Sequence, residues 1–330
     1  MARRALVVGI NSYNNVTPLR ACVSDAEAIV KRLSRQEDGT PNYDCRALLD
    51  RMEDGAPITR STLRAAVTDL FDNFRGEVVL YFSGHGILTS GGGYLCTTDA
   101  EKNDWGLPMQ EVVDLAQVSK CSDILIMLDC CHSGDFANPG LLKGGPNPLT
   151  SLRENMAVMA ASLPSEASLE AGNHGLFTAA VLDALDGGAA DHMGYVSASS
   201  IYAYVHRRFG AWDQRPVYKS YATGVTIIRQ CAPLIDRLKL RELVKLFPTQ
   251  ESKLFLDPEY EPEDENGVCH EPVSVEKVRV AKLLKEYRDA GLLRATEQDE
   301  QLYWTARRSH SAELTNRGKE YWWLVAKKKV

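Results

Sequence analysis

Short apolar runs alternate with longer amphipathic stretches along roughly the first 230 residues of the chain. The run "ALVVGI" has the length of a buried strand, and similar runs recur downstream. Between them, apolar residues return at helical spacing, as in Ala26, Ile29 and Leu33. The pattern predicts strands at 5–10, 45–50, 77–82, 123–128, 154–162 and 223–229, and helices after residue 24 and at 59–74, 108–118, 175–188 and 197–209.

The first helix carries a start signal in its sequence. Ser24 and Glu27 stand three positions apart, which is the spacing of a capping box. In that motif each side chain bonds the other residue's backbone N–H. We therefore expect this helix to be capped by Ser24.

Strands that alternate with helices predict an α/β fold, with a mostly parallel sheet flanked by helices on both faces. Such sheets bind ligands beyond the carboxyl ends of their strands. His85 follows the third predicted strand, and Asp129 and Cys131 follow the fourth. Asp25 lies in the first turn of the helix after the first strand. We expect these four residues to meet at one edge of the sheet.

The alternating pattern of strands and helices changes after residue 232. Its length of 330 residues predicts about two domains, and we place them at 1–232 and 233–330. An acidic, proline-bearing linker at 256–267 precedes a helix at 274–293 that ends at Gly291. A strand at 301–308 and a helix at 314–329 complete the pattern. This succession resembles a small winged-helix α+β domain.

The charge and the apolar runs of the chain indicate which kinds of partner to expect. The whole net charge of −6 falls in 1–232, while 233–330 holds equal numbers of acidic and basic residues. Neither part has the basic excess of a typical DNA-binding protein. No apolar run reaches the roughly 18 residues of a membrane span, and the N-terminus lacks the pattern of a signal peptide. We expect a cytoplasmic protein with no membrane partner.

The cysteines and acids give no sign of a cofactor. None of the eight cysteines forms a Cys-x-x-Cys pair, which argues against a zinc or thioredoxin motif. In a reducing compartment we expect them to be thiols. Asp99, Glu101 and Asp104 follow His85 but are scattered along the chain, so we expect no calcium requirement.

The segments "YFSGHG" and "LDCCHSGDF" contain the residues of a nucleophilic site. A cysteine nucleophile needs a histidine to take its proton and backbone donors for the oxyanion. The glycines on either side of His85 let the backbone approach a substrate closely. The oxyanion donors would be the amides of Gly86 and Cys131.

The same two segments resemble the caspase-fold cysteine peptidases, on the metacaspase side of that family. "VVGINSYNNVTPLRACVSDA", "HGLFTAAVLDAL" and "DQRPVY" are similar to further parts of the family, so the resemblance covers roughly 3–230. It implies that Cys131 is the nucleophile and His85 the base, that Cys130 is only a neighbour, and that the substrates are proteins. A structural role for a histidine or a cysteine pair is the alternative.

The resemblance also implies a substrate preference. Metacaspase-like members present aspartates in the first substrate pocket, and the matching positions here are Asp25 and Asp129. Two carboxylates would pair with the guanidinium of Arg or the ammonium of Lys, which predicts cleavage after these residues. Asp25 could instead serve the helix dipole, and Asp129 could be a buried structural acid.

The loop at 137–153 is rich in glycine and proline in its first half, which predicts a flexible segment. In the family this region is often cut on activation, so Lys143 and Arg153 are candidate self-processing sites. A plain surface loop is the alternative.

Basic and acidic residues share the helix at 274–293, as in Lys277, Arg279 and Lys285 beside Glu276 and Glu286. This mixture is typical of a solvated face, and it could also form an adaptor surface for an activating protease or another partner protein. DNA binding is the alternative. Short caspase-like proteins of this build resemble prokaryotic effectors of defence systems, including some tied to CRISPR signalling. A regulated effector protease is therefore the leading interpretation, ahead of a DNA-binding or adaptor regulator with a caspase-like sensor domain.

Overall fold

The structure is a computed structural model, in which side chains and backbone are described for most of the chain. The described residues are 2–50, 56–130, 152–161, 170–171, 174–209, 216–263, 267–269, 271–297 and 300–330. They divide into two compact units, Met1–Ala232 and Pro233–Val330, each of which is considered by itself.

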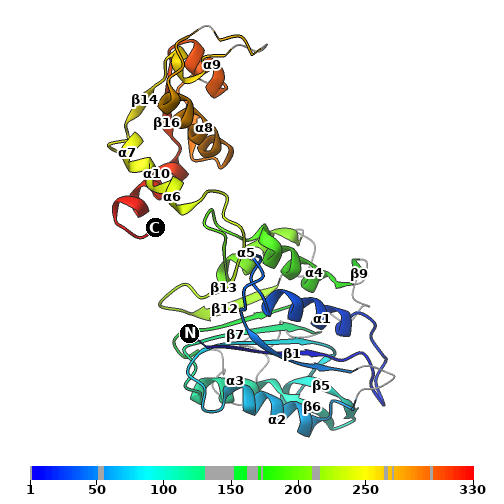
Figure 1. The fold of residues 1–330 in the computed structure, drawn as a ribbon. Coiled ribbons are helices and arrows are strands. Elements are labelled where there is room, and N and C mark those ends of the chain that lie inside the picture. Colours follow the sequence, from blue (N-terminus) through cyan, green and yellow to red (C-terminus); the bar gives the residue numbers. More distant parts are fainter. Residues whose placement is uncertain are drawn as a thin grey trace. The chain divides into compact units, whose positions relative to one another are not determined.

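A six-stranded sheet forms the centre of the first unit (Figure 1). Its order is β12-β8-β7-β3-β1-β2, and every neighbouring pair is parallel except β12 with β8. The mostly parallel sheet confirms the predicted fold class. The bounds are Arg3–Gly9 for β1, Asp44–Leu49 for β2, Glu77–Ser83 for β3, Asp123–Asp129 for β7, Met156–Ala160 for β8 and Val217–Tyr221 for β12.

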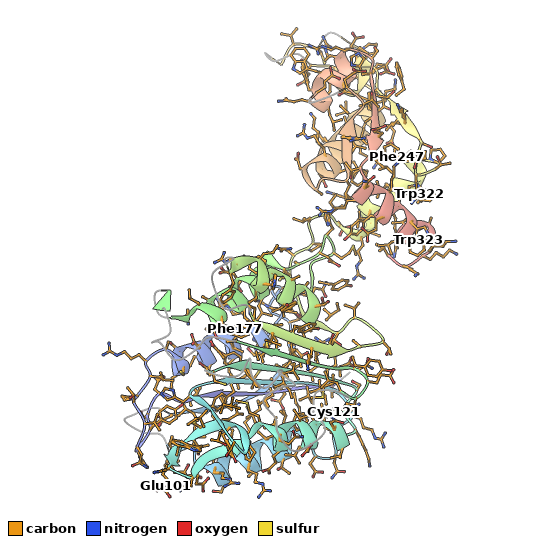
Figure 2. The ribbon with its side chains drawn as sticks, turned by 180° about the vertical axis from the view of Figure 1, so that it is seen from behind. Glu101, Cys121, Phe177, Phe247, Trp322 and Trp323 are labelled. Carbon is orange, nitrogen blue, oxygen red and sulfur yellow. The ribbon has the colours of Figure 1, made fainter. Side chains whose placement is uncertain are left out.

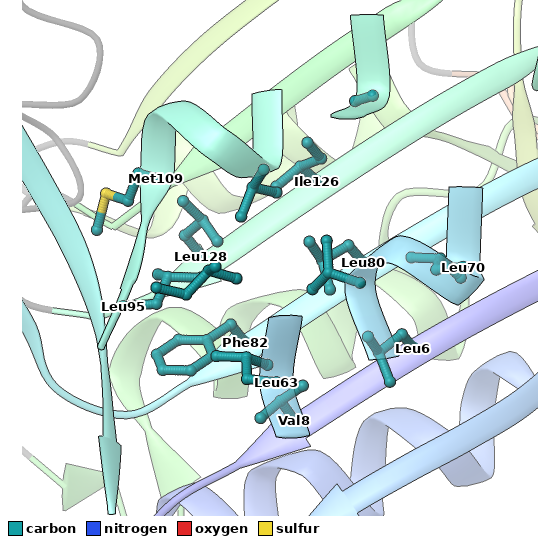
Figure 3. Close-up of a cluster of buried hydrophobic side chains, with 14 of the residues drawn as sticks. Leu6, Val8, Leu63, Leu70, Leu80, Phe82, Leu95, Met109, Ile126 and Leu128 are labelled. Carbon is teal, nitrogen blue, oxygen red and sulfur yellow. The ribbon is translucent and has the colours of Figure 1, made fainter. Parts of the chain in front are cut away.

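Helices cover both faces of this sheet, and each face has its own hydrophobic core. Figure 1 shows α2 (Arg60–Phe71) and α3 (Met109–Val118) on one face. The other face carries α1 (Cys22–Leu33), α4 (Leu176–Asp183) and α5 (Ala198–Arg208). Alternate strand residues supply the two cores, so Leu6, Leu80 and Ile126 pack toward α2 and α3 (Figure 3). The residues between them pack toward α1 and α4.

The capping box predicted for the first helix is wrong. Helix α1 begins at Cys22, its N-cap residue is Ala21, and no side chain caps it. Ser24 therefore lies inside the first turn, where its hydroxyl donates to the Ala21 carbonyl oxygen at 2.8 Å. Because Ser24 has helical backbone inside the first turn, it does not occupy the N-cap position from which a side chain caps the helix.

The sequence pattern missed several short strands. Directly after His85 the chain forms a three-stranded antiparallel sheet of β4 (Gly86–Thr89), β5 (Gly92–Glu101) and β6 (Asp104–Pro108). The strand predicted at 223–229 is β13 (Ile227–Gln230), which pairs with β11 (Tyr195–Ser197) outside the main sheet. The edge of the main sheet is β12, whose sequence "VYKSY" lacks an apolar run because it is only partly buried.

The second unit is a small α+β assembly. Its antiparallel sheet has the order β14-β16-β15. The predicted strand at 301–308 is wrong, because Leu302–Arg307 forms helix α9. Trp322 donates its indole N–H to the Phe247 carbonyl oxygen at 2.6 Å (Figure 2). The remaining bounds are Arg237–Arg241 for α6, Leu243–Leu246 for α7, Lys253–Phe255 for β14, Val275–Asp289 for α8, Leu293–Ala295 for β15, Ser311–Leu314 for β16 and Asn316–Ala326 for α10.

The cations of α8 are largely neutralised within the second unit. Lys277 pairs with Asp257 and Glu259, Lys285 pairs with Glu261, and Arg279 pairs with Glu276. Arg288 likewise pairs with its neighbour Asp289. These pairs leave little free positive charge on the helix, which disfavours phosphate binding.

None of the helices in the described part of the chain combines the length and the apolar character that a membrane crossing requires.

Candidate active site

Three neighbouring strands end at the same level of the sheet. Gly9 of β1 pairs with Ser83 of β3, and Ser83 pairs with Asp129 of β7. The Gly84 N–H donates to the Asp129 carbonyl oxygen at 3.3 Å, which holds the two chains together as they leave the sheet. His85 is therefore the second residue beyond the end of β3, next to the end of β7.

Asp25 reaches the same edge from α1, although helix α1 covers the sheet face. Only 2% of its side chain is exposed. One carboxylate oxygen lies 2.7 Å from Nδ1 of His174. The other accepts the N–H of Gly175 and the hydroxyl of Ser83, each at 3.4 Å. Asp25 is thus a buried acid held by the end of β3 and by β10 (His174–Gly175).

Asp129 is held by a chain of buried hydroxyl groups. Thr178 of α4 donates to its carboxylate at 2.5 Å. The hydroxyl of Tyr81 lies 2.5 Å from the same Thr178 oxygen. Tyr81 and Thr178 are both fully buried. The Thr178 contact therefore fixes the direction of the Asp129 carboxylate at the sheet edge.

Gly175 lies between the two acids. A Cβ atom at this position would stand 3.3 Å from one carboxylate oxygen of Asp129 and 3.5 Å from one of Asp25. Both carboxylates therefore face the same point, and the missing side chain of glycine leaves that point free. We call Asp25, Asp129 and Gly175 the acidic pocket.

Burial and repulsion change the acidity of this pocket. Burial and the negative charge of Asp129 together raise the pKa of Asp25 to about 7, although the hydrogen bonds from His174 and Gly175 oppose the rise. Burial also raises the pKa of Asp129, against the hydrogen bonds from Thr178. A cation that entered the pocket would stabilise the ionised carboxylates and so lower the pKa of both acids.

The ring of His85 is oriented by the loop after β1. Its Nε2 lies 2.7 Å from the Thr17 carbonyl oxygen. A carbonyl oxygen can only accept, so Nε2 carries the hydrogen and the lone pair of the neutral ring is on Nδ1. The protein thereby selects one tautomer and leaves Nδ1 as the basic atom.

Tyr13 fixes the backbone of the same histidine. Its hydroxyl accepts the His85 N–H at 2.8 Å and donates to the Ile10 carbonyl oxygen at 3.2 Å. Its ring lies against the imidazole, with centroids 4.8 Å apart. Burial raises the pKa of Tyr13 well above its ordinary value, so the phenol stays protonated and can donate.

One backbone donor beside His85 is not used by the strand ladder. The Cys96 N–H donates to the His85 carbonyl oxygen at 2.9 Å, and Gly86 is paired with Leu95. Hydrogen-bonded and non-hydrogen-bonded pairs alternate in an antiparallel ladder. Because His85 and Cys96 are joined by a hydrogen bond, the next pair, Gly86 with Leu95, is a non-hydrogen-bonded pair. The ladder therefore leaves the Gly86 N–H for another acceptor.

Comparison with known proteins explains this combination of acids, histidine and parallel sheet. Residues 2–226 match the model of the caspase domain. The chain belongs to the caspase family. It is 30% identical over 145 residues to Metacaspase-7 of Arabidopsis thaliana, covering 41% of this chain and 35% of that protein. It is 29% identical over 152 residues to Metacaspase-6 of the same plant, covering 41% and 39%. The chain thus spans well under half the length of these relatives.

The expected nucleophile of this caspase domain, Cys131, lies outside the described residues. Its neighbour Cys130 is described, with 5% of its surface exposed, in the hydrophobic core beside α2 and α3. Asp129 belongs to the opposite set of strand positions, which faces α1 and α4, because successive side chains of a strand alternate. The role of Cys130 as a neighbour of the nucleophile stays a prediction.

Of the two candidate processing sites, the structure describes only one. Lys143 lies outside the described residues. Arg153 is described, and its guanidinium donates to the carbonyl oxygens of Ser119 and Cys121 at 2.9 and 2.6 Å. Arg153 therefore tethers the segment between α3 and β7.

Two of the three acids that follow His85 in the sequence contact Arg60. Asp104 pairs with the Arg60 side chain at 2.9 Å, and Asp99 accepts the Arg60 N–H at 3.2 Å. Glu101 is exposed. Among the residues that the structure describes, no group of three or more His, Cys, Asp or Glu side chains could hold a metal ion.

Sequence reasoning found the two acids and His85 but missed their partners. His174, Thr178, Tyr13 and Thr17 had no assigned role. His174 and Thr178 lie in "HGLFTAA", a segment that the family resemblance included. A histidine directly before a helix, in a segment already matched to the family, was the one available signal for His174.

Proposed function

We propose that the protein is a cysteine endopeptidase that cleaves protein substrates after Arg or Lys. The observation that carries the proposal is the acidic pocket, in which Asp25 and Asp129 face one point beside the bare Gly175. Its position next to His85, at the carboxyl ends of β3 and β7, supports a substrate side chain bound beside the reacting bond.

The chemical steps follow from the roles of Cys131 and His85. Nδ1 of His85 takes the thiol proton, and the thiolate sulfur attacks the scissile carbonyl carbon. The carbonyl oxygen becomes negative and is stabilised by the N–H groups of Gly86 and Cys131. Collapse breaks the C–N bond, with His85 giving its proton to the leaving amine, and leaves a thioester. Water, deprotonated by His85, then hydrolyses the thioester and restores the thiol.

The pocket selects the bond that reacts. Two carboxylates can hold the planar fork of a guanidinium through several hydrogen bonds, whereas an ammonium is a single point charge. We therefore expect Arg to be preferred over Lys. A substrate with Asp at this position would place a third negative charge beside Asp25 and Asp129 and would be rejected.

Self-processing would follow the same preference. A cut after Arg153 requires this side chain to leave the carbonyl oxygens of Ser119 and Cys121. We therefore assign the first cut to Lys143, with Arg153 cut only after its release.

We assign residues 233–330 to regulation or to a partner protein. The internal pairing of the α8 cations supports a protein partner over DNA. The resemblance to prokaryotic defence effectors supports a role as a regulated effector protease in a defence or stress pathway.

A peptide-library cleavage profile tests the activity. The full chain should cut after Arg and Lys, and the Cys131→Ala and His85→Ala variants should cut nothing. Cleavage that persists in Cys131→Ala would overturn the assignment of the nucleophile. A complete lack of cleavage after every residue type would remove the basis for a peptidase.

A further inference from the structure

Asp25, one of the two acids of the pocket, is covered in the structure, and His174 is the most exposed of its described hydrogen-bond partners. Asp25 has only 2% of its side chain exposed, so a ligand reaches it only if a neighbour moves. Among its described hydrogen-bond partners, Ser83 and Gly175 are buried. His174 is 31% exposed, which places it between Asp25 and solvent.

Among the described residues, the same side chain is the basic group that contacts the pocket. Within the described residues, no lysine or arginine forms an ion pair with Asp25 or Asp129. His174 holds Asp25 at 2.7 Å through Nδ1, the distance of a charge-assisted hydrogen bond when the ring is protonated. The imidazole ring therefore stands where a substrate cation would bind.

We propose that His174 is the gate of the acidic pocket: its imidazole ring covers Asp25 in the free enzyme, and the guanidinium or ammonium group of the substrate must displace it. The gate rests on the proposed preference for Arg and Lys. His174 lies in the short strand β10, at the N-terminal end of α4, so its ring can turn away without disturbing the central sheet.

Entry of a substrate cation also links binding to pH, because the cation binds the ionised form of Asp25. The groups that face the pair are Asp25 on α1, Asp129 at the end of β7, and the hydroxyls of Tyr81 and Thr178 on β3 and α4. The raised pKa of Asp25, about 7, fits a proton that this pair retains near neutral pH. Entry of a substrate cation expels that proton, so binding weakens as the pH falls. Loss of one proton corresponds to about a tenfold weaker Kd per pH unit below neutrality.

Binding to the full-length Cys131→Ala protein isolates the gate from catalysis. The Kd of an Arg-ended peptide is measured by calorimetry from mildly acidic to mildly alkaline pH. With His174 present, the Kd should rise about tenfold per pH unit in acid. His174→Ala removes the ring that covers Asp25 and admits water, which lowers the pKa that burial raises, so the acid weakening should shift to lower pH and the Kd in mild acid should fall.

A matched histidine provides the control. His310 holds Glu300 through Nδ1 at 2.9 Å, and its side chain is 36% exposed, but the pair lies in the second unit. His310→Ala should leave the Kd and its pH dependence unchanged. His174→Asn, which lacks the charge and the reach to Asp25, should behave like His174→Ala and replaces it if the alanine variant does not fold.

Three outcomes would contradict the gate or its basis. If His174→Ala keeps the full acid weakening over the same pH range, the burial of Asp25 does not depend on His174 and His174 is no gate. If His174→Ala weakens binding at every pH, His174 supports the ligand and does not exclude it. If neither Arg-ended nor Lys-ended peptides bind any form and the active enzyme cuts neither, the proposed specificity itself is wrong.

Discussion

The acidic pocket and the surroundings of His85 lie at the same edge of the sheet but are built from different interactions. The pocket consists of two acids, the buried Asp25 and the partly buried Asp129, held by His174 and by hydroxyl groups. His85 is held by neutral partners, the Thr17 carbonyl oxygen and the Tyr13 hydroxyl. The pocket should therefore respond strongly to any change of charge, whereas the base should respond to small changes of geometry.

The largest expected effect comes from the reacting groups themselves. Cys131→Ala and His85→Ala should each abolish cleavage while the thermal unfolding transition is retained. The matched Cys130→Ala variant changes the neighbouring thiol in the core and should keep most of the activity. An inactive Cys130→Ala together with an active Cys131→Ala would reverse the assignment.

Loss of charge in the pocket should have the next largest effect. Asp25→Asn keeps the shape of the side chain but removes the charge that pairs with the substrate cation. We expect kcat/KM on an Arg-ended peptide to fall by about 10³-fold or more. The rate of Cys131 alkylation by iodoacetamide should stay the same, because the dyad is intact. The exposed acid Glu101 offers the control, and Glu101→Gln should change neither quantity.

The same variant should be more stable than the natural protein near neutral pH. The folded-state pKa of Asp25 is about 7, raised from an ordinary value of 3.8 mainly by burial. Between these values the folded state binds more protons than the unfolded state, so Asp25 reduces stability as the pH rises through this window. Asp25→Asn removes that cost, and we expect a gain of about 1–2 kcal/mol at neutral pH. Thermal melts should show no gain below about pH 4; a loss of stability at neutral pH would contradict the raised pKa.

A change of geometry at the base should have a smaller effect. Tyr13→Phe keeps the ring against the imidazole but removes the hydroxyl that accepts the His85 N–H. We expect kcat to fall about 10-fold, since a small displacement of a base is costly, while KM for an Arg-ended peptide is retained. Steady-state kinetics would separate the two constants. A change confined to KM would show that Tyr13 acts on the pocket and not on the base.

Removal of metal should have the smallest effect. The acids after His85 are occupied with Arg60 or exposed, so we expect activity in the presence of EGTA to equal that in added calcium. A strict requirement for calcium in the same assay would overturn this interpretation.

The sequence predicts local features, such as the central strands, better than contacts between residues that are far apart in the chain. Strand runs such as 77–82 and 123–128 predict β3 and β7 because buried parallel strands are continuously apolar. The strand ends then place Asp129 and His85 at one edge. In contrast, 301–308 looks like a strand because of its aromatic residues, yet it folds as α9, which buries Leu302 and Ala306 on one helical face.

Contacts between distant segments explain what the sequence could not predict in the site. His174 and Asp25 are 149 residues apart, and Tyr13 and His85 are 72 apart. No spacing rule connects such pairs, because the sheet and its covering helices bring them together. The family resemblance was enough to predict the two acids, whereas the contacts of His174 and Tyr13 could be identified only from the structure.

The central claim, that charge in the acidic pocket selects the cleaved bond, is tested most directly with citrulline. Citrulline has nearly the shape of Arg but carries no charge. One peptide is prepared with Arg, Lys, citrulline or Asp before the scissile bond, and kcat/KM is measured for each. We predict the order Arg, Lys, then citrulline and Asp, with Arg favoured over citrulline by about 10³-fold or more. Equal cleavage of the Arg and citrulline peptides would contradict the claim, and cleavage of the Asp peptide alone would reverse it.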